Sequence, residues 1–203
     1  MYKYKLEQIE WTNIWREDAD NAEKPRLLLI GDSITQGYSA YVNRALDKKW
    51  ALTMLTTSKG IDNPSLLEEI FLLAKQENDK YDYIHFNNGL HAGYITDEDY
   101  EMFYQQTIWA LRDHFPASKL SIATSTTTCK KENGVMVLSD GDAKTVRRNE
   151  IVRRLAQSSK LPLDDLYTVS LTDLSLHCDD CTHFKPEGYE LLGKAVAAFL
   201  MSL

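Results

Sequence analysis

The stretch RLLLIGDSITQGY, residues 26–38, says more about the fold than any other part of the chain. Its four consecutive apolar residues, Leu27 to Ile30, are typical of a short strand that is buried on both faces. Gly31 permits a tight turn at the end of that strand, and Ser33 follows near the N-terminus of the next helix. Ser33 is therefore a candidate nucleophile, although a serine at such a turn also serves as an ordinary helix N-cap.

Strand and helix patterns alternate after this stretch, which is typical of a parallel α/β fold. Strands are expected at residues 27–31, 51–56, 82–87 and 119–124, with a weaker one near 164–168. Helices are expected near residues 39–48, 65–77, 97–114, 143–158 and 187–202. We predict a single domain over residues 26–203, because 203 residues suffice for one well-packed core and are short for two.

Two segments fall outside this alternation. Residues 1–25 are polar and are expected to pack on the domain as an N-terminal extension, with Trp11, Ile14 and Trp15 as anchors. Residues 129–142, CKKENGVMVLSDGD, carry glycine and aspartate turn signals. They are expected to form an irregular excursion that shapes a substrate cleft.

Composition and charge limit the class of protein and of partner. A hydrophobic content of 43% with 26% charged residues fits an ordinary globular protein. The net charge of −7 argues against nucleic acid or an anionic membrane surface as a partner, because both favour clustered positive charge. The basic pairs at residues 147–148 and 153–154 are expected on a solvated helix face. No stretch has signal-peptide or transmembrane character, so a cytoplasmic location is expected, although a chain with its leader removed would look the same.

The three cysteines are too few for a disulfide scaffold. Cys178 and Cys181 have the spacing of a redox or zinc-ligand pair, and His177 and His183 lie nearby. Two reduced thiols in a loop are the default interpretation, and a structural metal site is the alternative.

A serine nucleophile needs a base, and the base needs an orienting group. Asp180 stands three residues before His183, on a loop just ahead of the last predicted helix. Asp82 and His85 have the same spacing, but they lie in a predicted strand, where residues three apart point to opposite faces. Only the C-terminal pair can therefore cooperate with Ser33 at the end of the first parallel strand.

Gly-Asp-Ser-Ile after the first strand and Asp-x-x-His before the last helix together resemble the SGNH/GDSL hydrolase family, over about residues 26–203. The resemblance implies a three-layer α/β/α sandwich with a flavodoxin-like parallel sheet of about five strands. It also implies a serine esterase in which Ser33 is the nucleophile, His183 the general base and Asp180 the acid that orients it. No metal or organic cofactor is implied.

The resemblance further implies an oxyanion hole made of the serine N–H, a glycine N–H and an asparagine side chain. Ser33 and Gly60 match the first two by position. The third departs from the family pattern Gly-x-Asn-Asp, because residues 85–91 read HFNNGLH and His91 occupies the asparagine position. Either His91 or, from a shifted turn, Asn88 is the third donor, since both side chains carry N–H groups. We favour His91.

The stretch FNNGLHAGY and the tryptophan-containing extension resemble carbohydrate-directed esterases of this family. The expected substrate is a small-molecule or carbohydrate ester with a short acyl or acetyl group. Tyr38 and Tyr94 are candidates for stacking on sugar rings, whereas Trp109 has the spacing of a helix residue packed in the core.

Three alternatives to sugar-ester hydrolysis remain open at this point. The first is a lysophospholipase or thioesterase, and the second is an acyltransferase that uses the same residues. The third is a noncatalytic binding module on a hydrolase scaffold, because a fold does not fix a function.

Overall fold

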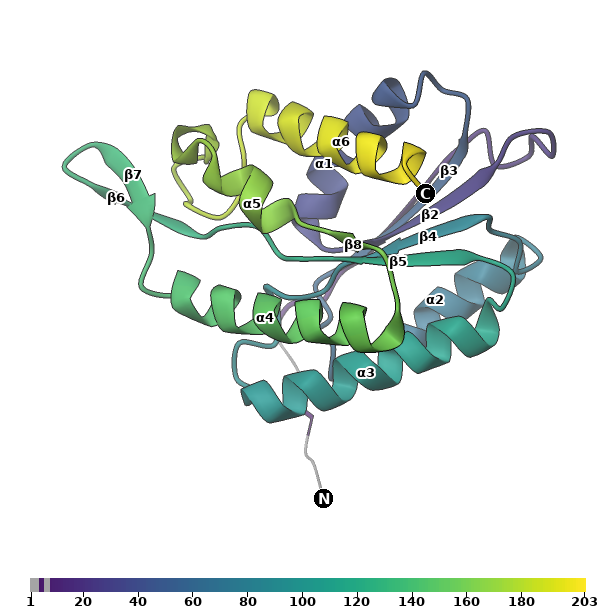
Figure 1. The fold of residues 1–203 in the computed structure, drawn as a ribbon, viewed down its shortest axis with the longest axis horizontal. Helices are drawn as coiled ribbons and strands as arrows, with labels where there is room; N and C mark the ends of the chain where they lie inside the picture. The colour runs from purple at the N-terminus through teal and green to yellow at the C-terminus, as the bar shows by residue number, and fades with distance from the viewer. Residues whose placement is uncertain (1–3, 6–7) are drawn as a thin grey trace.

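In the computed structural model, which describes residues 4–5 and 8–203, a central sheet lies between two layers of helices (Figure 1). The strands occur in the order β1-β3-β2-β4-β5-β8. In chain order they are β1 (Thr12–Glu17), β2 (Arg26–Gly31), β3 (Ala51–Thr57), β4 (Tyr83–Phe86), β5 (Lys119–Ala123) and β8 (Leu163–Asp164). The strands from β2 onward pair in parallel, in the order typical of flavodoxin-like folds. The expected three-layer α/β/α class is confirmed.

Each face of the sheet is covered by its own group of helices (Figure 1). One face carries α1 (Ser33–Ala45), α5 (Leu166–Leu171) and α6 (Pro186–Met201). The other face carries α2 (Ser65–Gln76), α3 (Asp97–His114) and α4 (Asp142–Ser159). A short 3₁₀ helix, η1 (Leu174–Leu176), precedes the loop that leads into α6.

The apolar run of β2 follows from its central position. Leu27 and Leu29 pack into the core below α1 and α6, whereas Leu28 and Ile30 pack into the opposite core. All four side chains are buried, and each contributes roughly 2 kcal/mol of hydrophobic stabilisation. A strand covered on both faces has no solvated side, so its sequence does not alternate.

The direction in which successive strands are added to the sheet reverses at β2. It passes from β2 through α1 to β3 on one side, and then from β3 through α2 to β4 on the other side. Right-handed crossovers place α1 and α2 on opposite faces, which opens a crevice at the carboxyl ends of β2 and its neighbours. Ser33, the loop containing Gly60 and the loop of residues 87–91 all follow strands at this edge.

The N-terminal segment is part of the sheet, which therefore has one strand more than expected. β1 pairs antiparallel with β3, from Thr12 opposite Thr57 to Glu17 opposite Leu52. The expectation that Ile14 and Trp15 anchor this segment is wrong, because their exposed fractions are 43% and 63%. Backbone pairing with the edge of β3 holds the segment, together with side-chain contacts such as the ion pair between Arg16 and Glu77.

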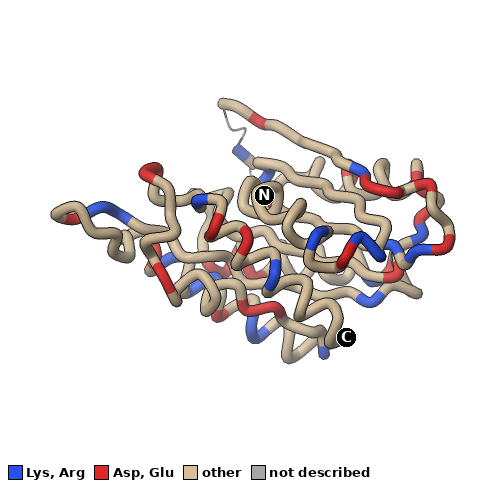
Figure 2. The backbone as a smooth tube through the Cα atoms, turned by 90° about the horizontal axis from the view of Figure 1, so that it is seen from above, with Lys and Arg blue, Asp and Glu red and all other residues tan. Residues whose placement is uncertain are grey.

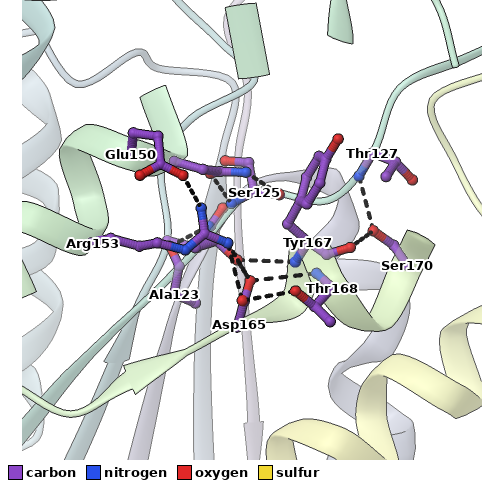
Figure 3. Close-up of polar contacts among 12 residues, drawn as sticks. Ala123, Ser125, Thr127, Glu150, Arg153, Asp165, Tyr167, Thr168 and Ser170 are labelled. Atoms are coloured by element: carbon purple, nitrogen blue, oxygen red, sulfur yellow. Dashed lines mark hydrogen bonds and ion pairs between the residues drawn. The ribbon is translucent and has the colours of Figure 1, made fainter. Parts of the chain in front are cut away.

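Two boundaries differ from the sequence prediction because an aspartate caps a helix. The first helix begins at Ser33 rather than near residue 39, since the Asp32 carboxylate accepts a hydrogen bond from the Ile34 amide at 2.9 Å. The strand expected at residues 164–168 ends at Asp164, because Asp165 caps α5. Figure 3 shows the Asp165 carboxylate between Arg153 and Thr168.

Residues 129–142 are more regular than expected. They contain the hairpin of β6 (Cys129–Glu132) and β7 (Val135–Leu138), which projects beyond the sheet (Figure 1). Its turn residues, Asn133 and Gly134, both have positive φ, as a two-residue turn of this kind requires. The irregular excursion expected from the sequence is therefore wrong, because Asn-Gly favours a tight hairpin.

Charged residues of both signs are interspersed along the chain (Figure 2). Among the described residues, no helix is both long and apolar enough to cross a bilayer. The expectation that the partner is neither nucleic acid nor a membrane stays a prediction.

Candidate active site

Ser33 is the first residue of α1 and directly follows the turn at the end of β2. The cap of this helix is the buried Asp32, so the alternative interpretation of Ser33 as the N-cap is wrong. A side chain at Gly31 would overlap Thr35, which explains why a glycine stands at this turn. The Ser33 hydroxyl is thus not used to cap the helix. It lies at a helix N-terminus, where the helix dipole favours developing negative charge.

His183 and Asp180 lie in the loop between η1 and α6, and this loop closes on itself through backbone hydrogen bonds. The Cys178 amide donates to the His183 carbonyl at 2.8 Å, and the Cys181 amide donates to the Cys178 carbonyl at 3.0 Å. His177 and Phe184 form an antiparallel bridge at the base of the loop. The loop is therefore a tight, locally defined turn whose tip carries the acid and the imidazole.

The structure brings Ser33, His183 and Asp180 into one hydrogen-bonded chain. His183 Nε2 lies 2.8 Å from Ser33 Oγ, and His183 Nδ1 lies 2.7 Å from Asp180 Oδ2. Because a carboxylate only accepts, Nδ1 carries the proton and Nε2 is the acceptor for the serine hydroxyl. Two groups separated by 150 residues in the chain thus meet at the carboxyl edge of the sheet.

Hydrogen bonds lower the pKa of the Asp180 carboxyl group below its ordinary value. Desolvation, the largest single influence, raises the pKa of its carboxyl group. The amides of Thr182 and His183 and the ring of His183 together outweigh it, and the pKa falls to about 2. The Asp180 carboxylate therefore carries a full negative charge where it bonds Nδ1 of the His183 ring.

The second Asp-x-x-His sequence does not form a pair. His85 is buried and its Nε2 lies 3.0 Å from Asp164 Oδ2, whereas Asp82 accepts a hydrogen bond from the Arg26 amide. The prediction that Asp82 and His85 do not cooperate is confirmed.

The candidate oxyanion residues lie on two neighbouring loops that contact each other. A side chain at Gly60, after β3, would overlap Ala92, after β4. The Asn88 side-chain amide donates to the Lys59 carbonyl at 2.9 Å, so it joins these two loops. Among the described residues, none forms a hydrogen bond with the partly exposed His91 ring. The roles of Gly60, His91 and Asn88 in catalysis stay predictions.

An open hollow of about 160 Å³ borders the loop after β4 and the start of α4. Leu90, Thr128 and Lys144 are among its lining residues. Leu90 also lines a small space next to Asp32, but none of Ser33, Asp180 and His183 is among the residues that line the hollow.

The aromatic residues considered for sugar stacking are placed differently from the prediction. Tyr38 is fully buried and hydrogen-bonds Thr35, so it cannot stack on a substrate. Tyr94 is partly exposed and donates to Asp62 at 2.7 Å. Trp109 does not pack in the core, because 63% of it is exposed on the outer side of α3.

All three cysteines are free thiols. Cys178 and Cys181 belong to the loop of residues 178–184, and Cys129 is the first residue of β6. The Cys129 amide donates to the Cys181 carbonyl at 2.8 Å, which joins this loop to β6. Desolvation raises the pKa of the Cys129 thiol to about 11, so this thiol is protonated at neutral pH. Within the described part of the chain, no three His, Cys, Asp or Glu side chains are grouped for metal binding.

The sequence analysis missed two residues of α4 that hold the loops at this edge. The sequence predicts a solvated position for Arg148, but Arg148 is only 2% exposed and donates to three carbonyls of the loop after β4. Asn149 bonds both backbone groups of Ser125 through its side-chain amide. An arginine and an asparagine next to each other on a predicted amphipathic helix give no signal that they point inward.

A further contact holds α5 against the loop that follows β5. The Thr127 amide donates to Ser170 Oγ at 2.9 Å (Figure 3). The Tyr167 amide donates to Thr124 Oγ1. This contact fixes the segment that leads toward the loop of residues 178–184.

Neither a protein-family model nor a curated protein sequence matches the chain. Solved structures do. The aryl esterase of M. smegmatis has a TM-score of 0.72 at 17% identity, over 88% of this chain and 99% of that chain. A carbohydrate acetylesterase from Sinorhizobium meliloti has a TM-score of 0.70 at 14% identity, over 88% and 99%. An acetylxylan esterase from Geobacillus stearothermophilus has a TM-score of 0.66 at 15% identity, over 87% and 94%. At such identities the likeness shows a shared fold.

Proposed function

We propose that this chain is a serine ester hydrolase of the SGNH/GDSL type, with Ser33 as nucleophile, His183 as general base and Asp180 as orienting acid. The observation that carries the proposal is the 2.8 Å contact between Ser33 Oγ and His183 Nε2. The contact lies at the reversal point of a parallel sheet, where α/β folds place their ligands. The fold shared with several esterases supports the same reaction class.

In the proposed reaction, Ser33 Oγ attacks the ester carbonyl while its proton passes to His183 Nε2. Asp180 holds the ring and stabilises the imidazolium that forms. When the carbonyl re-forms, the C–O bond to the alcohol breaks and His183 returns the proton to the departing alkoxide oxygen. Water, deprotonated by His183, then attacks the acyl-serine. The tetrahedral intermediate that forms breaks down, which releases the acid and restores the Ser33 hydroxyl with the proton from His183.

The tetrahedral intermediate carries a negative oxygen that needs hydrogen-bond donors. We assign the Ser33 and Gly60 N–H groups and the His91 ring to this role, with Asn88 as the alternative third donor. The Asn88 amide already bonds the Lys59 carbonyl, which favours His91. Donors fixed before the reaction stabilise developing charge most effectively.

The proposed substrate is an acetyl or other short acyl ester of a carbohydrate. Two of the similar structures are a carbohydrate acetylesterase and an acetylxylan esterase.

The nucleophile is tested with p-nitrophenyl acetate. Ser33→Ala should lower kcat by at least about 10³-fold, because the reaction loses its covalent intermediate. Ser39→Ala removes a hydroxyl from the same helix, where it only bonds the Gln36 carbonyl, and should retain full activity. Equal activity of Ser33→Ala and the wild type would refute the proposal.

The substrate class is tested by acetate release from acetylated sugars, compared with release of acid from short acyl esters and acyl thioesters. The highest kcat/KM is expected on the acetylated sugars. A preference for thioesters would reject the carbohydrate assignment and leave the triad in place.

A further inference from the structure

We infer that Arg148 is a positioning residue that fixes the loop carrying the candidate oxyanion donors. The inference rests on the proposed function, because it assigns Arg148 a part in the same reaction. Arg148 itself lies on α4 and bonds the loop after β4, and in the described structure it forms no hydrogen bond with Ser33, Asp180 or His183.

The contacts of Arg148 converge on one short stretch of backbone. Its Nη1 donates to the carbonyls of Gly89 at 2.9 Å and His91 at 2.8 Å, and its Nη2 donates to that of Ala92 at 2.7 Å. A guanidinium is a rigid planar fork, so three such bonds fix the relative orientation of the peptide groups they hold. His91, the favoured third donor, lies inside this stretch.

The charged guanidinium of Arg148 is buried where it forms these hydrogen bonds. The residue is 2% exposed, and no carboxylate of the described residues forms an ion pair with it. Its guanidinium instead lies 4.6 Å from the centre of the Tyr100 ring, whose hydroxyl donates to the Asn88 carbonyl at 2.8 Å. Burying an arginine costs several kcal/mol, which these charge-assisted hydrogen bonds and the ring contact offset.

The held stretch includes a backbone conformation that is unfavourable by itself. Ala92 has φ of 54°, in the left-handed region that costs a residue with a side chain about 1 kcal/mol. The bond from Arg148 Nη2 to the Ala92 carbonyl holds this conformation. Strain of this kind persists only where the surroundings define the loop tightly.

Arg148 also affects the second candidate loop through Ala92. Ala92 lies so close to Gly60 that a side chain at residue 60 would overlap it. Asn88 bonds the carbonyl of the neighbouring Lys59. A displacement of Ala92 therefore changes the packing of Gly60, whose N–H is the other candidate donor. One buried side chain thus supports both loops.

The test compares Arg148→Lys and Arg148→Met with Arg147→Met on the same helix. Arg147 is exposed and pairs with Asp97, so its loss should leave activity unchanged. Lysine keeps the charge but cannot hold three carbonyls at once. For Arg148→Lys we expect kcat on p-nitrophenyl acetate to fall about 10- to 100-fold, with KM within about threefold of the wild type.

Two further measurements separate positioning from general destabilisation. The pH profile of kcat should keep its shape, because Arg148 contacts the donor loop and not His183 or Asp180. Hydrogen exchange should speed up in the peptide covering residues 88–92 and stay unchanged in the one covering residues 26–33. If Arg148→Met does not fold, Arg148→Lys still provides the test.

A kcat within about twofold of the wild type in a folded Arg148→Lys variant would overturn the inference. Faster exchange throughout the protein would overturn it as well, since that result indicates a purely structural role. Ser33→Ala, measured in parallel, reports on the proposed function separately. If Ser33→Ala stays active, the ester hydrolase proposal fails, and unchanged exchange at residues 88–92 would still show that Arg148 does not fix the loop.

Discussion

Two histidine–aspartate pairs with similar distances have opposite surroundings in this molecule. His85 Nε2 lies 3.0 Å from Asp164, and His183 Nδ1 lies 2.7 Å from Asp180. In the first pair the side chains are 0% and 6% exposed, and in the second they are 40% and 53% exposed. The first joins two strands inside the sheet, whereas the second stands on a loop at its carboxyl edge.

The second ring nitrogen separates the two pairs further. His85 Nδ1 is buried without a hydrogen-bond partner among the described residues, whereas His183 Nε2 meets the Ser33 hydroxyl. A histidine can pass a proton only when its other nitrogen reaches a reacting group. A short histidine–aspartate distance therefore marks a structural contact as readily as a catalytic one. Substitutions in and around the two pairs should separate these two roles.

His183→Ala should cause the largest loss. We expect kcat to fall by about 10⁴-fold or more with little change in stability, because the serine loses its base while the exposed loop loses few contacts. His114→Ala is a matched control, since His114 is partly exposed and lies 2.9 Å from Asp79 but contacts no serine in the described structure. Steady-state kinetics and thermal unfolding check both. An active His183→Ala variant would remove the distinction between the pairs.

Asp180→Asn should lower kcat by about 10³-fold, because an amide can no longer hold the proton of the ring on Nδ1. Asp82→Asn changes the acid of the other Asp-x-x-His sequence, which bonds the Arg26 amide instead of a histidine. That variant should keep the wild-type kcat. Equal losses in the two variants would contradict the assignment of Asp180.

His91→Ala should lower kcat by about 10²-fold with little change in KM, because one donor to the oxyanion is lost. Asn88→Ala removes the bond to the Lys59 carbonyl and should mainly lower the melting temperature. If Asn88→Ala has the larger effect on kcat, the two assignments are exchanged. If neither variant changes kcat, the third donor lies elsewhere.

His85→Gln should act on stability alone. The buried Asp164 loses its histidine partner, and we expect the free energy of unfolding to fall by roughly 1–3 kcal/mol. The kcat of the folded variant should equal that of the wild type. Chemical denaturation gives the stability, and an activity loss without a stability loss would show that the buried pair takes part in the reaction.

The smallest effect concerns pH. The pKa of Asp180 is lowered from 3.8 to about 2, so its ionised form stabilises the folded state above pH 4, and this contribution is lost as the pH falls toward 2. The gain is below about 1 kcal/mol, because the group is more than half exposed. Asp180→Asn should therefore melt slightly below the wild type at pH 5 and together with it near pH 2. A difference between the two melting temperatures that increases as the pH is lowered would contradict this prediction.

Local sequence features predicted the central strand and the candidate triad. The run Leu27 to Ile30 indicated a strand covered on both faces, and β2 is such a strand. The spacing of Asp180 and His183 indicated an acid and an imidazole on one turn, which backbone hydrogen bonds close locally. Strand β1 left no such signal, because Trp15 and Ile14 look like buried anchors although both are exposed, and the strand is held by backbone pairing and by the Arg16 side chain.

Features that depend on neighbouring residues follow from the local sequence: the turn at Gly31, the helix start after Asp32, the tight hairpin at Asn133 and the pairing of Asp180 with His183. Each of these is set by backbone preference or by a hydrogen bond that spans a few residues.

The contact of His183 with Ser33, the inward orientation of Arg148 and the pairing of His85 with Asp164 depend instead on the folded arrangement of the whole chain. These contacts join residues far apart in the chain, and their geometry depends on strand order and on which helix covers which face. Residue type and spacing do not fix that order, because the same local pattern packs equally well in several topologies until long-range pairing selects one.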